Sequence, residues 1–205
     1  MKRGILVLLL FLSACSVPPR QAPQYLGSGT SEQQGNLQEE DIPTTSWLQL
    51  EAEKVLTALA ENNFQDLAVL IDPEQGVRFS PYGDFGTGDR ILKPEDLIKD
   101  DNAVYTWGNY AGNGEPIELS KAAYFEQFVY PVDFLHAPEV LINTITDRGG
   151  VIVNIEEAFP NAEYIQYFFP GFREELAGMD REGLYLIFDK KTKKLIGIAH
   201  EMRTG

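Results

Sequence analysis

The sequence predicts an α+β protein in which N-terminal helices pack on one face of a curved antiparallel β-sheet, giving a cone-like shape. Apolar residues recur at helical spacing near residue 50, strand-like stretches dominate the second half of the chain, and polar turns separate those stretches. Helices followed by a run of strands are typical of α+β domains. The 205 residues, 43% of them hydrophobic, fit one globular domain with appended segments.

The first helix is predicted from Ser46 to about Glu61. Ser46-Trp47-Leu48-Gln49 fits a capping box, in which the side chains of Ser46 and Gln49 bind free backbone N–H groups. The apolar residues of this segment then fall at helical spacing: Leu48, Ala52, Val55, Leu56 and Leu59. The pattern predicts one amphipathic helix.

Three shorter helices are expected after it. The second ends before Pro73, because a proline disfavours helical geometry in the preceding residue. Its apolar face consists of Phe64, Leu67, Ala68 and Ile71. One or two helical turns begin at Pro94, and a further helix begins at Ser120 and buries Tyr124 and Phe128.

The strands are expected mainly in the second half of the chain. They are predicted at 76–80, 103–108, 140–146, 151–155, 164–169, 183–188 and 195–200. Gly149-Gly150 and the polar stretch 189–194 are typical of hairpin turns. The last strands are therefore expected to form an antiparallel meander.

Residues 1–14 follow the pattern of an export signal peptide. Lys2-Arg3 supply the charged start, and the apolar run Ile5 to Leu12 follows. A membrane-spanning helix needs roughly 20 apolar residues, and no stretch of the chain approaches that length. We therefore expect no segment of the mature chain to cross a bilayer.

Cys15 is the single cysteine of the chain and follows the apolar run directly. Leu12-Ser13-Ala14-Cys15 resembles the lipobox of bacterial lipoproteins. The resemblance implies that lipoprotein-processing enzymes cut before Cys15 and attach a diacylglyceryl group, with acyl chains such as palmitate, to its thiol. Two acyl chains anchor a protein stably to a membrane, with the domain in the cell envelope outside the cytoplasm. The alternative is an unpaired cysteine that lies near the N-terminus by chance.

The lipidated cysteine and a flexible linker together form residues 15–43, before a single α+β domain at 44–205. The linker is rich in Pro, Gln, Gly and Ser and almost lacks apolar periodicity. As a flexible coil it spans about 30 Å.

The net charge argues against nucleic acid as a partner. The chain has 17 Lys and Arg against 31 Asp and Glu, a formal charge of −14. Removing Lys2 and Arg3 with the leader leaves −16. Nucleic-acid affinity depends on clustered Lys and Arg that neutralise phosphates, and nothing in this acidic sequence suggests a basic stripe.

Several motifs of the domain resemble a group of uncharacterised bacterial lipoproteins over roughly residues 47–200. They are the segments 72–82, 105–108, 134–138, 169–172 and 178–180. The order of elements is also similar to the nuclear-transport-factor-two-like cone, also called SnoaL-like or cystatin-like. This resemblance implies a fold and a compartment but no activity, because such cones serve isomerases, dehydratases, binding modules and assembly domains.

Cones of this kind usually hold a pocket between sheet and helices, which inward-facing strand residues would line. The candidate ligand-binding residues are Arg78, Ser80, Tyr82, Trp107, Tyr124, Asp133, His136, Tyr167 and His200. Arg78 suits a bidentate clamp on a carboxylate or phosphate, or a structural ion pair. Asp133 and His136 suit general base chemistry, or a structural or exposed role, and His200 leaves the same choice open.

Other motifs indicate structure rather than chemistry. The carboxylate of Asp180 suits a turn cap, and the glycines near residue 86 lack a phosphate-binding fingerprint. No zinc or calcium pattern is found, and no cofactor is expected. The lysines at 190, 191, 193 and 194 suit a solvated hairpin tip or a docking patch for a partner.

The leading functional hypothesis is a non-enzymatic envelope lipoprotein whose domain binds a small ligand or a protein partner. The alternative is a small-molecule hydrolase, isomerase or dehydratase that uses a pocket Asp or His. An enzyme would require Asp133, His136 or His200 to converge in one concave site. A third hypothesis is assembly through an open sheet face.

Overall fold

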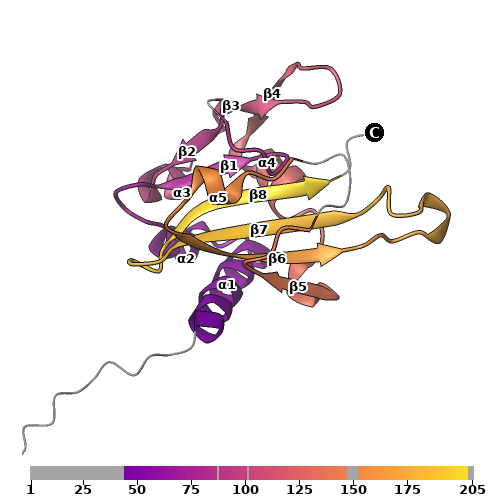
Figure 1. Cartoon of the computed structure of the whole chain (residues 1–205). Coiled ribbons are helices and arrows are strands. Elements are labelled where there is room, and N and C mark those ends of the chain that lie inside the picture. The colour runs from indigo at the N-terminus through magenta and orange to yellow at the C-terminus, as the bar shows by residue number, and fades with distance from the viewer. Residues whose placement is uncertain (1–43, 87, 101, 147–151, 203–205) are drawn as a thin grey trace, which may run out of the picture. The chain divides into compact units, whose positions relative to one another are not determined.

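The computed structural model describes residues 44–86, 88–100, 102–146 and 152–202, which form an α+β fold as predicted (Figure 1). Its helices and helical turns are α1 (Thr44–Ala60), α2 (Phe64–Leu70), α3 (Pro94–Ile98), α4 (Lys121–Tyr124), the π-helical turn η1 (Phe125–Val129), the 3-10 turn η2 (Phe134–His136), α5 (Ile155–Ala158) and the 3-10 turn η3 (Glu174–Leu176). Its strands are β1 (Val77–Ser80), β2 (Arg90–Leu92), β3 (Val104–Asn109), β4 (Pro116–Ser120), β5 (Glu139–Ile142), β6 (Ala162–Phe169), β7 (Glu182–Asp189) and β8 (Leu195–Met202).

The described strands form one six-stranded sheet in the order β2-β1-β8-β7-β6-β5, and β3 and β4 pair separately. Neighbouring strands are antiparallel except β1 and β8, which run parallel with Arg78 opposite Gly197. The prediction of a wholly antiparallel sheet was therefore wrong. Parallel neighbours need a long crossover connection, and more than half of the domain lies between β1 and β8.

The two faces of the sheet pack against different partners. Alternate residues of β7 point to opposite faces, and they belong to two separate hydrophobic clusters. Leu184 and Leu186 pack in the larger cluster, with α1 and α2, whereas Tyr185 and Ile187 pack with Ile155 of α5. The helices were predicted on one face only, and α5 corrects that prediction.

Residues 151–155 need the main secondary-structure correction, because they were predicted to form a strand. Val151 lies outside the described residues, 152–154 form no strand, and α5 begins at Ile155. Asn154 explains the change. Its side chain accepts from the Phe85 backbone N–H (2.7 Å) and donates to the Phe85 carbonyl (3.0 Å), which holds this segment against the β1–β2 connection. Gly149-Gly150 also lies outside the described residues.

Smaller differences concern the ends of elements. α1 begins at Thr44, two residues before the predicted start at Ser46. β5 ends at Ile142 rather than near 146, because Asn143 has φ +47° and its side chain accepts from the Tyr164 N–H. The helices at 64, 94 and 120 and the hairpin turn at 189–194 are confirmed, whereas β2 and β4 were not predicted.

Asp72 joins two distant parts of the fold, and its replacement provides a pH-dependent prediction. One carboxylate oxygen accepts from the N–H groups of Glu74 and Gln75, both at 2.9 Å, and the other accepts from the Thr192 hydroxyl at 3.1 Å. Burial raises the pKa of Asp72, but these hydrogen bonds outweigh it, and the pKa lies below its ordinary value of 3.8. The carboxylate therefore stabilises the fold above that ordinary value, and this contribution is lost as the pH falls through the lower, folded-state pKa.

We expect Asp72→Ala to lower the free energy of unfolding at pH 7 by about 2 kcal/mol. The difference from wild type should shrink as the pH falls from the ordinary value of 3.8 through the lower folded-state pKa. Urea unfolding from pH 7 downwards measures both quantities, with the exposed Glu118→Ala as control. A difference that stays constant down to the lowest pH would contradict the role of the ionised carboxylate.

Candidate functional site

Trp107 of β3 and Tyr124 of α4, two predicted ligand-binding residues, pack together in the core. Their rings stack with centroids 3.9 Å apart and planes 6° apart, and both side chains are buried. The Trp107 indole Nε1–H donates to the Leu119 carbonyl at 3.0 Å. Burial raises the pKa of Tyr124 well above its ordinary value. This stack fixes the β3–β4 hairpin to α4.

Phe128 of η1 brings further candidates together. The rings of Tyr124, Tyr82 and His200 have centroids 5.2, 6.2 and 6.3 Å from that of Phe128. Burial raises the pKa of Tyr82. Trp107 joins the group through its stack on Tyr124. Four of the nine predicted residues thus converge on one aromatic cluster, although the chain separates them by up to 118 positions.

His200 lies in β8 with only 1% of its surface exposed. Its Nε2 is hydrogen-bonded to the Glu182 carboxylate of the neighbouring strand β7. Within the part of the chain that the structure describes, its Nδ1 has no hydrogen-bond partner. The His200 imidazole therefore pairs with Glu182, whereas Asp133 and His136 pair with each other.

Arg78 and Ser80 of β1 brace the connection to β2. The Arg78 Nε donates to Asp89 at 2.9 Å, and the guanidinium also donates to the Gly86 carbonyl. Burial raises the pKa of Asp89. The hydrogen bond from the Gly86 N–H and the charge of Arg78 lower it, but burial outweighs them. Ser80 is buried and donates to the Asp84 carbonyl at 2.9 Å. Of the two roles considered for Arg78, the structural ion pair is observed.

Asp133 and His136 do meet, as general base chemistry would require, but at the surface. The His136 Nδ1 lies 2.6 Å from one Asp133 oxygen, and the Tyr130 hydroxyl donates to the other at 2.8 Å. The hydrogen bond to His136, followed by that from Tyr130, lowers the pKa of Asp133. The side chain of His136 is 83% exposed and that of Asp133 57%. The pair therefore lacks the enclosure that a water-limited active site needs.

Glu201 is the centre of a buried polar network that the sequence did not indicate. It is 1% exposed, and its Oε2 accepts from Gln166 Nε2 at 2.5 Å and from the Tyr185 hydroxyl at 3.1 Å. Arg181 Nε lies 3.9 Å from Oε1. Gly183 lies opposite Glu201, and a Cβ there would come within 3.0 Å of the Glu201 Cβ. This pairing follows from the register of β7 and β8, so the sequence carried no signal of it.

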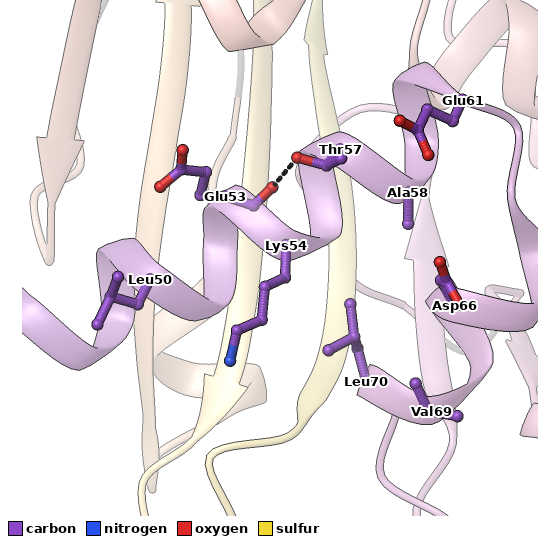
Figure 2. Close-up of a pocket in the computed structure, with 9 residues that line it drawn as sticks. All are labelled: Leu50, Glu53, Lys54, Thr57, Ala58, Glu61, Asp66, Val69 and Leu70. Carbon is purple, nitrogen blue, oxygen red and sulfur yellow. Dashed lines mark hydrogen bonds between the residues drawn. The ribbon is translucent and has the colours of Figure 1, made fainter.

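Two surface grooves border α1. The first, between α1 and α2, has a volume of about 530 Å³ and is shown in Figure 2. We call it the α1–α2 groove, and it is lined by Leu50, Glu53, Lys54, Thr57, Ala58, Glu61, Asp66, Val69 and Leu70. Inside α1 the Thr57 hydroxyl donates to the Glu53 carbonyl at 2.8 Å, the bond drawn in Figure 2.

The second groove lies between α1, η2 and the β5–β6 pair, with a volume of about 480 Å³. It contains Tyr167, the last of the predicted residues, and shares Leu50 and Glu53 with the first groove. Burial, together with the charge of Glu53, raises the pKa of Tyr167 to about 12. Both grooves are therefore open depressions on either side of one exposed helical face.

Of the residues that line the two grooves, only Tyr167 was predicted from the sequence as a ligand-binding residue. Leu50 could have indicated the grooves, because this apolar residue lies outside the predicted apolar stripe of α1. In the structure it is 53% exposed. No group of three or more His, Cys, Asp or Glu side chains among the described residues could hold a metal ion. No described helix is long and apolar enough to cross a membrane. Cys15 and the linker lie outside the described residues.

Comparison with known proteins adds no assignment. No protein-family model matches the chain, and no curated protein is significantly similar to it.

Proposed function

We propose that this chain is a lipoprotein anchored through Cys15 to a membrane of the cell envelope, with a folded domain outside the cytoplasm that binds a partner. The observation that carries the proposal is the order of the N-terminal residues. A charged start precedes the apolar run Ile5–Leu12, and Leu12-Ser13-Ala14-Cys15 ends it with the single cysteine. Residues 15–43 then act as a tether that gives the domain reach.

The shape of the domain favours binding over catalysis. Asp133 and His136 are exposed, whereas His200 is buried against Glu182, so the residues proposed for acid–base chemistry lie in different environments. The grooves along α1, in contrast, combine exposed apolar side chains with carboxylates. Such a surface suits a partner that covers it.

A cone of the nuclear-transport-factor-two-like kind is the finer fold that we propose. The support is the packing of α1 against β6, within the antiparallel run of strands β5–β8. The parallel pairing of β1 with β8 adds a mixed edge to that arrangement.

The anchor is tested by labelling cells with radioactive palmitate. Wild-type protein should carry the label and leave the membrane fraction only with detergent, because two acyl chains anchor stably. Cys15→Ala should lose all label, whereas the matched control Ser16→Ala should keep it. Equal labelling of the Cys15→Ala chain, or an unlabelled wild-type chain of unprocessed size, would overturn the proposal.

A further inference from the structure

The α1–α2 groove carries exposed apolar residues from both of its helices. Leu50 is 53% exposed, and Val69 of α2 is 67% exposed. Exposed apolar residues are ordinary when they are scattered singly. These two line the same α1–α2 groove, together with the buried Ala58 and the half-buried Leu70. The groove therefore offers an apolar strip between two packed helices, in which Lys54 separates Leu50 from Val69 and Leu70 (Figure 2).

Carboxylates surround this strip. Glu53, Glu61 and Asp66 line the groove, and Figure 2 shows Glu61 and Asp66 at the end away from Leu50. The lining cation is Lys54, whose ammonium lies 2.6 Å from the Glu51 carboxylate. A second cation, Lys194, donates to the Val69 carbonyl at 2.8 Å. Counting Glu51, four carboxylates face two ammonium groups, so the surface favours positive charge.

Resting on the proposed function, we propose that the α1–α2 groove binds an amphipathic helix of a protein partner, with an apolar face flanked by lysine or arginine. Helices commonly lay an apolar face into a groove between other helices. Small-molecule sites bury 70–90% or more of their ligand, by contrast. Leu50 and Val69 are each more than half exposed, so the groove is too open for that class.

Charge also favours a basic helix over three other possible occupants of the groove: the chain before α1, a second copy of the protein and anionic lipid. The chain just before α1 contains Glu39-Glu40-Asp41, which the carboxylates would repel, and a second copy carries a net charge of −14 or below. Three of the four lysines of a second copy's β7–β8 turn are already engaged. Lys190 lies 3.4 Å from Glu163, Lys193 lies over the Trp47 ring, and Lys194 donates to the Val69 carbonyl. Anionic lipid is repelled for the same reason as a second copy.

The test uses the full chain, purified from membranes in a neutral detergent, and two fluorescent peptides. Each peptide has about 14 residues, roughly four helical turns. One places Leu on one helical face and Lys on the other, and its matched control replaces every Lys with Glu. Fluorescence anisotropy should show the Leu–Lys peptide binding at least about tenfold more tightly than the Leu–Glu peptide.

Variants then locate the binding surface. Val69→Asp should weaken binding of the Leu–Lys peptide about tenfold or more, because it places a charge in the apolar strip. Val104→Asp is the matched control, since Val104 is 65% exposed on β3, and it should leave affinity unchanged. Glu61→Lys should also weaken binding and reduce its dependence on salt.

Three results would overturn the inference: equal affinity for both peptides, equal effects of Val69→Asp and Val104→Asp, or self-association of the wild-type chain that Val69→Asp abolishes. The last result would identify a second copy as the occupant. Palmitate labelling of the same preparations tests the anchor separately. A labelled chain that fails to bind the peptide contradicts this inference alone, and an unlabelled chain contradicts the proposed function.

Discussion

Replacing Trp107 with alanine is expected to lower the free energy of unfolding by about 4 kcal/mol. Trp107 is fully buried, stacks on Tyr124 and contacts the edge of Phe79 at a centroid distance of 5.5 Å. Truncation would leave a large cavity between β3, α4 and β1, and the Leu119 carbonyl would lose its indole donor. Urea unfolding measured by circular dichroism gives the change.

Two further variants separate the contributions of Trp107. Trp107→Phe keeps a stacked ring but removes the indole donor, so it should cost about 2 kcal/mol. Phe172→Ala is the control for aromatic loss at the surface, because Phe172 is 52% exposed, and it should cost less than about 1 kcal/mol. A Trp107→Ala protein as stable as Phe172→Ala would show that the ring stack contributes little.

Replacing Lys121 with methionine should lower the free energy of unfolding by about 3 kcal/mol. Lys121 is buried at 6% exposure, and its Nζ donates to the carbonyls of Leu97 (2.5 Å), Lys99 (2.6 Å) and Asp96 (3.2 Å). These carbonyls lie at the C-terminal end of α3, where helical carbonyls lack partners within the helix. Methionine would fill the volume of the stem but leave the carbonyls without this donor.

Lys54→Met is the matched control for that substitution. Lys54 is 57% exposed and pairs with Glu51 three residues earlier in α1, so its loss should cost less than about 1 kcal/mol. Chemical denaturation of both variants under one set of conditions gives the comparison. Equal losses would mean that the ammonium of Lys121 is not needed to satisfy the end of α3.

Local pattern predicted the helices well because their causes are local. The stripe Leu48 to Leu59 in α1 and the break before Pro73 depend on neighbouring residues only. The pairing of β1 with β8 depends on residues more than 100 positions apart, and no local signal encodes its parallel direction. The segment before Ile155 looked like a strand, but Asn154 binds the backbone of the distant Phe85 instead.

The features of the candidate site also fall into those that local spacing predicts and those that depend on distant parts of the chain. The contact between Asp133 and His136 was predictable from their spacing, since both lie around one 3-10 turn, but their exposure was not. The burial of Glu201 and the pairing of His200 with Glu182 follow from the register of β7 and β8. The α1–α2 groove requires the packing of one helix on another, which the two separate helical patterns do not specify.

The proposed anchor and groove make a single physical picture. A lipid on Cys15 would fix one end of the chain at the membrane, and a tether of about 30 Å would hold the acidic domain clear of anionic headgroups. The α1–α2 groove would then face partners held in the same envelope at a high effective concentration.

The intact mass of the wild-type chain, extracted from membranes and measured by mass spectrometry, examines the basis of this picture. We predict a polypeptide that begins at Cys15 and carries the added mass of a diacylglyceryl group. The Cys15→Ala chain should show the mass of an uncut polypeptide without lipid. A wild-type mass equal to that of the full 205-residue chain, or of a shortened chain with no lipid, would contradict the lipoprotein assignment.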